Sequence, residues 1–85
     1  MKFTIEGKNY EIIIASDVNQ RDGIGCELWD MNKDELLLEI FRDDTLKRLS
    51  FYTSKAINFP LEVLDLAMQA FNEIPGRTFI DYDSP

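Results

Sequence analysis

Short stretches that alternate apolar and polar residues occupy the first part of the chain, and one longer stretch with a helical period follows them. The alternating stretches are residues 2–5, 10–14, 24–31, 35–41 and 47–53. Alternation with a period of two is typical of strands with one buried face. Their order predicts an α+β domain, β-β-β-β-β-α, in which an antiparallel sheet of about five strands carries one amphipathic helix on one face.

The helix is expected over residues 60–74, where apolar residues recur at three- and four-residue intervals. That apolar stripe consists of Leu61, Leu64, Ala67, Met68, Phe71 and Ile74. Pro60 suits the first helical turn with Asn58 as the cap, and Pro75 and Gly76 suit the end. We expect the stripe to lie buried between the helix and the sheet.

A tight hairpin is expected to join the first two strands. Gly7 and Lys8 suit a two-residue type II′ turn, because glycine accepts the positive φ of the first central position. That turn would place Ile5 opposite Tyr10. Apolar residues of both strands would then share one face of the sheet.

The chain is expected to form one domain over residues 1–82, followed by a frayed tail at 83–85. Residues 77–82 alternate weakly, which fits either a short sixth strand at the sheet edge or part of the tail. Residues 16–23 form the longest polar break in the pattern. A break of this kind is the natural place for a functional loop.

The net negative charge of the chain disfavours some classes of binding partner. The 85-residue chain has 16 acidic and 9 basic residues, a formal net charge of −7. Nucleic acids and anionic membranes attract basic surfaces, so we expect neither to be a partner. Solubility alone is the simpler explanation of the acidity, and attraction to a basic protein is the alternative.

Residues for common active sites are missing from the sequence. It contains no histidine, and its four glycines form no phosphate-binding motif. We therefore expect no catalytic residue, no cofactor and no metal. The only cysteine, Cys26, alternates with apolar residues and should be a buried, inert thiol. A single cysteine and the absence of a signal or membrane-spanning pattern favour the cytoplasm.

Acidic residues are paired at several places without an obvious chemical purpose. Asp43 and Asp44 fall in an expected turn, where solvation explains them best. If Leu28 pairs with Leu38, Glu27 lies opposite Glu39, and like charges in that arrangement repel each other. The register could differ, a cation such as Arg48 could lie between them, or the pair could be functional.

The strands also predict a second apolar face. With Leu38 opposite Phe51, the helix would cover a face made of Cys26, Leu28, Leu36, Leu38, Ile40, Leu49 and Phe51. The opposite face would hold a row of Trp29, Leu37 and Tyr52, with Met31 and Phe41 beside it. Aromatic residues and methionine are enriched in protein interfaces. Alternatively, this row covers a curled sheet or lies under the 16–23 loop.

These features favour a non-enzymatic protein-interaction or regulatory module that forms a homodimer through the uncovered apolar sheet face. The alternative is an inhibitor or immunity-type protein whose acidic surface binds a basic protein. An enzyme that uses carboxylates alone is the weakest reading. The expected partner is thus a protein or a second copy of the chain.

Overall fold

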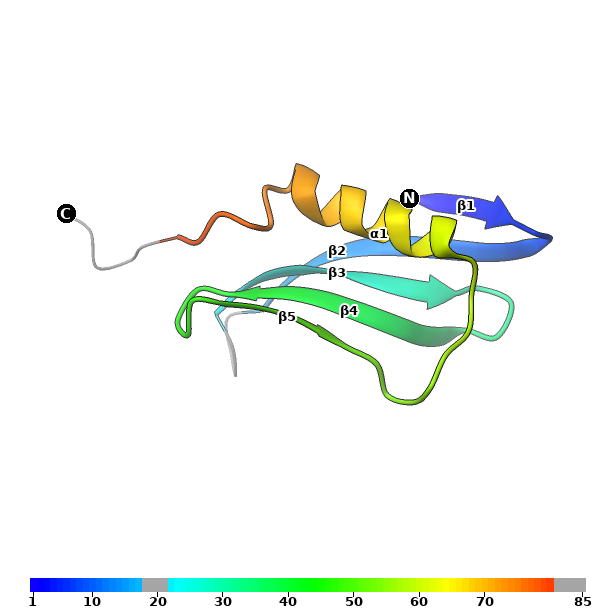
Figure 1. Ribbon diagram of the computed structural model, residues 1–85, viewed down its shortest axis with the longest axis horizontal. Coiled ribbons are helices and arrows are strands. Elements are labelled where there is room, and N and C mark those ends of the chain that lie inside the picture. The colour runs from blue at the N-terminus through cyan, green and yellow to red at the C-terminus, as the bar shows by residue number, and fades with distance from the viewer. Residues whose placement is uncertain (18–21, 81–85) are drawn as a thin grey trace.

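The computed structural model describes residues 1–17 and 22–80, which form one five-stranded antiparallel sheet with a single helix on one side (Figure 1). The elements are β1 (Lys2–Ile5), β2 (Lys8–Asp17), β3 (Gly23–Asp30), β4 (Glu35–Asp43), β5 (Arg48–Tyr52) and α1 (Leu61–Glu73). Strands adjacent in sequence are adjacent in the sheet. The predicted α+β architecture is confirmed.

Two irregular segments differ in part from expectation. Residues 77–80 form no strand, so the sixth strand, one of the two alternatives for that stretch, is excluded there. The expected polar loop is shorter than predicted, because β2 continues to Asp17 and β3 begins at Gly23. Positions 18–21 of that loop, positions 81–82, and the frayed tail at 83–85 lie outside the described residues.

The β1–β2 hairpin turns one residue earlier than predicted. Its central residues are Glu6 and Gly7, with φ of 52° and 78°, as a type I′ turn requires. The prediction of Gly7 and Lys8 is therefore wrong, and the register moves by two. Phe3 now lies opposite Tyr10, and their rings stack with centroids 5.5 Å apart. A shift of two residues leaves each side chain on its predicted face.

The β3–β4 and β4–β5 turns have the same hydrogen-bonding pattern. In each, the aspartate that ends a strand accepts hydrogen bonds at Oδ1 from the N–H groups two and three residues later. The residue after those has positive φ although it is not glycine. The turn residues are Asp30, Asn32, Lys33 and Asp34 in the first, and Asp43, Thr45, Leu46 and Lys47 in the second.

A β-bulge changes the faces of β4. Leu28 lies opposite Leu38, as predicted, but Trp29 lies opposite Leu36. Leu37 is the extra residue, and it packs against the core on the helix side. The predicted faces of Leu36 and Leu37 are therefore wrong, because a bulge reverses the alternation beyond it.

The β4–β5 register also differs from the prediction. Phe51 lies opposite Ile40 instead of Leu38, because β4 extends to Asp43 before the chain turns. The shift is again two residues, so Phe51 stays on the helix side. Its neighbours along the sheet change, however, and with them the row expected on the opposite face.

Helix α1 begins without a side-chain cap. Pro60 occupies the cap position itself, and no side chain bonds to the first turn, so the predicted cap at Asn58 is wrong. At the other end, the Gly76 N–H donates to the Phe71 carbonyl at 2.8 Å. A Cβ at Gly76 would lie 2.7 Å from the Phe71 ring, which explains why glycine follows Pro75 here.

The core lies between α1 and the middle of the sheet. Its fully buried members are Tyr10, Ile12, Cys26, Leu28, Leu38, Ile40, Val63, Ala67 and Phe71. The helix approaches β3 most closely, at the small residue Ala67, whose carbonyl lies 3.5 Å from Cys26 Sγ. Phe71 is 1% exposed, as predicted, whereas Leu64 and Met68 are half-buried.

A buried ion pair connects the β4–β5 turn to the chain after the helix. Arg42 Nε lies 2.9 Å from Asp44 Oδ1, and both side chains are almost fully buried. Arg42 also donates to the Pro75 carbonyl, and Asp44 accepts from the Ile80 N–H. These bonds hold residues 75–80 against one end of the sheet.

Phe71→Ala should lower the free energy of unfolding by about 3–5 kcal/mol, the usual cost of removing a buried phenylalanine. Denaturant unfolding measures the change. Asp65→Ala, at an exposed position of the same helix, is the control and should change stability by less than about 0.5 kcal/mol. Equal effects of the two substitutions would mean that α1 presents a different side to the sheet.

Asp44→Ala should destabilise the fold by about 3–5 kcal/mol, because it leaves the Arg42 guanidinium buried without its counter-charge. The double variant Arg42→Met/Asp44→Leu removes both charges and should cost much less than the two single changes together. Unfolding of the four proteins gives the coupling energy. Additive costs would show that the pair does not act as a unit.

Candidate functional site

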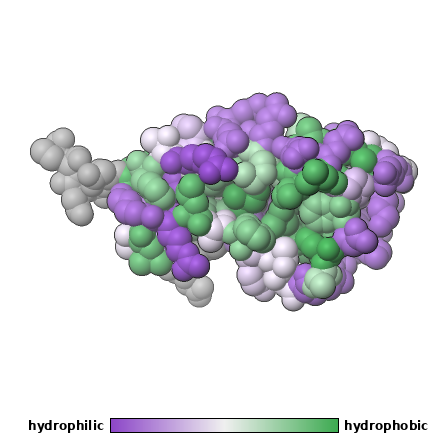
Figure 2. All heavy atoms as spheres, in the orientation of Figure 1, coloured by the Kyte–Doolittle hydropathy of each residue, from purple (hydrophilic) through white to green (hydrophobic). Residues whose placement is uncertain are grey.

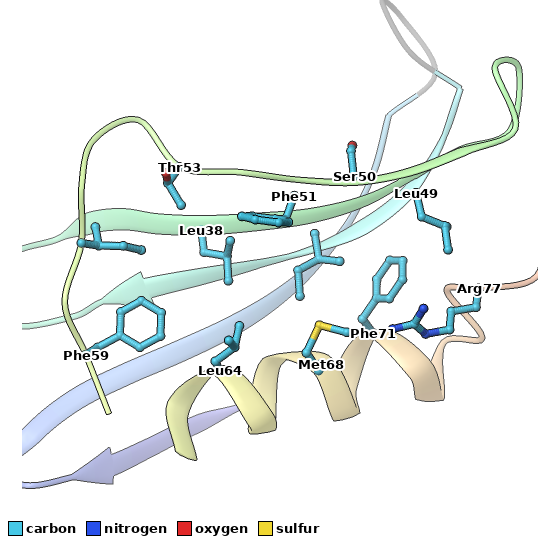
Figure 3. A pocket seen from close by; sticks show the side chains of 12 residues that line it. Leu38, Leu49, Ser50, Phe51, Thr53, Phe59, Leu64, Met68, Phe71 and Arg77 are labelled. Carbon is cyan, nitrogen blue, oxygen red and sulfur yellow. The ribbon is translucent and has the colours of Figure 1, made fainter. Parts of the chain in front are cut away.

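An apolar groove runs between α1 and the helix side of β4 and β5. Its volume is about 490 Å³. Its lining is Leu38, Ile40, Leu49, Ser50, Phe51, Thr53, Ile57, Phe59, Leu64, Met68, Phe71 and Arg77. Figure 3 shows Leu64 and Met68 directed from the helix toward side chains of the sheet. We call this the α1–β5 groove.

The groove exists because the helix covers the middle of the sheet only. An α-helix is about 10 Å wide, and strands lie about 4.8 Å apart, so one helix reaches across about two or three strands. Here it lies along β3. A smaller hollow of about 310 Å³, lined by Ile12 and Ile14, flanks its other side.

Large apolar side chains remain accessible at the mouth of the groove. Phe51 is 75% exposed and Leu49 is 37% exposed, although both face the helix side of the sheet. In Figure 2, apolar residues extend through the middle of the molecule, below the polar outer side of α1. Few polar groups line the groove. One is Arg77, which donates to Asn72 Oδ1 at 2.8 Å.

The interaction residues predicted from the sequence do not form one row. Trp29 lies on the face away from the helix, opposite Leu36, and its Nε1 donates to Glu27 Oε1 at 3.1 Å. Leu37 lies on the helix side because of the bulge. Tyr52 lies opposite Glu39. The predicted Trp29–Leu37–Tyr52 contacts are therefore wrong.

Phe41 and Met31, which were predicted to lie beside that row, differ from each other in exposure. Phe41 is only 3% exposed, and its ring lies over the β3 glycines, where a Cβ at Gly25 would approach it to 3.0 Å. Met31 lies at the β3–β4 turn and is partly exposed. A binding role for Trp29, Tyr52 and Met31 stays a prediction.

Sequence reasoning missed the groove residues Phe51, Leu49 and Phe59. The prediction placed the uncovered apolar surface on the face away from the helix. The useful signal was the small residue Ala67 in the middle of the helical stripe. A small residue there lets the helix come close to one strand and leaves distant strands uncovered.

The acidic pairs have structural explanations. Asp44 is paired with Arg42, and Asp43 caps the turn. Glu27 does lie opposite Glu39, as the predicted register requires, and it accepts the bond from the Trp29 ring. Within residues 1–17 and 22–80, no group of three acidic or cysteine side chains could hold a metal ion.

Cys26 lies in the core, as predicted, and is 1% exposed. Burial, with a smaller contribution from the negative charge of Glu39, raises the pKa of the Cys26 thiol to about 11. The thiol is therefore protonated near neutral pH and is a poor nucleophile. It belongs to the packing under α1 and takes no part in the groove.

No protein-family model, curated protein or solved structure matches the chain. In the described part of the chain, α1 lacks the length and apolarity needed to cross a membrane.

The buried thiol gives a direct test of the core. A thiol reagent at about pH 8 should label native Cys26 far more slowly than the unfolded chain. A pKa near 11 leaves about one thiolate in a thousand, against about one in ten for the usual value of 9.0. Labelling in concentrated urea is the control. Equal rates in both conditions would show that Cys26 is accessible.

Proposed function

We propose that the chain is a non-enzymatic protein-interaction module whose contact surface is the α1–β5 groove. The observation that carries this proposal is the exposure of Phe51, 75%, at the mouth of an apolar groove. Small soluble domains rarely leave connected apolar surface in water unless it binds something. The proposed location is the cytoplasm, where a single reduced cysteine is ordinary.

The shape of the groove favours a protein over a small molecule. Small-molecule sites usually enclose most of the ligand surface and contain several converging polar groups. This groove is bordered on one side by the last strand of the sheet, and its most prominent aromatic residue projects into solvent. A chain segment can lie along such a surface while its polar atoms stay in water.

The proposal includes the predicted homodimer, in which the partner is a second copy of the chain. The face away from the helix offers less apolar surface for it than expected, because Phe41 is buried and Leu37 lies on the other side. The groove offers an alternative contact. Self-association would then use Phe51 instead of Trp29.

An inhibitor-type function is the second candidate, and one observation favours it. Glu62, Asp65 and Glu73 are exposed on the outer side of α1. A basic protein could bind there by charge attraction. That contact would lie on the opposite side of the helix from the groove.

Site-specific photocrosslinking separates these candidates. A benzoylphenylalanine at position 51 should give a discrete crosslinked protein in the cells that make the chain, because this position lies in the contact. The mass of the product distinguishes a second copy from another protein. The matched position is Asp65, which is also exposed but lies outside the groove.

Crosslinks from position 65 without crosslinks from position 51 would support the inhibitor-type alternative. The same reagent at Trp29 tests the face predicted from the sequence. No crosslinked protein from position 51 would contradict the proposed groove contact.

A further inference from the structure

We propose that the occupant of the α1–β5 groove is an extended acidic segment of another protein, which adds a strand to the edge of β5. This inference rests on the proposed function and specifies its partner. The segment would hydrogen-bond to the backbone of β5, and its alternate side chains, if apolar, would enter the groove. Three observations support this: an open edge, a groove along that edge, and a local excess of positive charge.

The edge of β5 is available for pairing. Among residues 1–17 and 22–80, the sheet ends at β5, and no segment lies hydrogen-bonded along its outer side. An edge strand presents backbone donors and acceptors that an incoming extended chain can satisfy. Figure 1 shows β5 at the border of the sheet, away from β1 and β2.

The groove lies where the side chains of an added strand would point. Leu49, Phe51 and Thr53 line it at two-residue spacing along β5 and the residue beyond its end. In an added strand, every second side chain points to the same side of the sheet. These side chains would lie beside Leu49 and Phe51 and face Met68 across the groove.

Charge indicates which segment would bind. The chain has a net charge of −7, yet the stretch between Asp44 and Glu62 contains three basic residues and no acidic one. Those residues are Lys47, Arg48 and Lys55, all of them exposed. Lys55 pairs with Glu35, and the Lys47 ammonium donates to the Ile80 carbonyl. Arg48 lies opposite Asp43 in the sheet, but among the described residues its side chain forms no ion pair. An acidic segment would supply one.

The same charges disfavour a second copy as the occupant. Two β5 strands paired along their length about a two-fold axis would place Arg48 of each chain opposite Tyr52 of the other, so the seam would offer Arg48 no acidic partner. Basic residues on edge strands commonly prevent such pairing. Negative charges on an incoming segment would lie beside Arg48, so an acidic strand gains an attraction that a second copy of β5 lacks.

Two synthetic peptides test the inference. One alternates glutamate and leucine over eight residues, and the other alternates lysine and leucine. Binding is measured by fluorescence anisotropy of labelled peptide, and amide exchange is followed by NMR. The acidic peptide should bind at least about tenfold more tightly than the basic one, and its affinity should fall as salt rises. Binding should also slow amide exchange in β5.

Two variants locate the contact. The charge reversal Arg48→Glu should weaken binding of the acidic peptide by at least about tenfold. The control Lys2→Glu makes the same change of charge on β1, at the far edge of the sheet, and should have a much smaller effect. Phe51→Ser should weaken binding as well, and its unfolding curve shows whether the fold is intact.

The contrary outcomes are distinct. Equal binding of both peptides, lost in Phe51→Ser, would overturn the acidic partner but leave the groove as a contact surface. Binding without slower exchange in β5 would overturn strand addition. Absence of binding by the acidic peptide, or a chain already dimeric through position 51, would overturn the inference as a whole. Only the absence of crosslinks from position 51 contradicts the proposed function itself.

Discussion

One helix is too narrow to cover a five-stranded sheet, and this mismatch in width determines most of the structure. Five strands at about 4.8 Å spacing span roughly 19 Å, about twice the width of a helix. Val63, Ala67 and Phe71 place α1 over the middle of the sheet, where Ala67 allows close contact with Cys26. The core is therefore compact but narrow. Apolar side chains at the β5 edge stay outside it, and the groove is the result.

The sequence predicted the strands and the helix correctly, but it predicted the pairing register of several strands incorrectly. Alternation and helical period identified all five strands and α1, because both patterns are local. The turns were harder, since Glu6, Asp34 and Lys47 adopt positive φ, which is usually the role of glycine. Two registers consequently moved by two residues and kept their faces. The bulge at Leu37 moved Leu36 and Leu37 to the faces opposite those predicted, and no local sequence pattern indicates that bulge.

The candidate site could not be predicted for a related reason. Phe51 looks like a core residue in sequence, and it does face the helix side of the sheet. Its exposure depends on where α1 lies across the sheet, which the contacts of Ala67 and Phe71 decide. The basic stretch around β5 is present in the sequence, but the net charge of −7 suggested an acidic surface and gave no reason to expect a local basic one. Its position on an edge strand, beside an apolar groove, gives that stretch a function to test.

Hydroxyl-radical footprinting with mass spectrometry compares the solvent exposure of two phenylalanines in the same native protein, and so measures whether the groove is open. Phe51 is 75% exposed beside the groove, and Phe71 is 1% exposed under the helix. We predict that Phe51 is oxidised at least about tenfold faster than Phe71, since both have the same intrinsic reactivity and differ in burial. Equal protection of the two rings in the monomeric chain would show that α1 or another segment covers the β4–β5 surface, and would contradict an open groove.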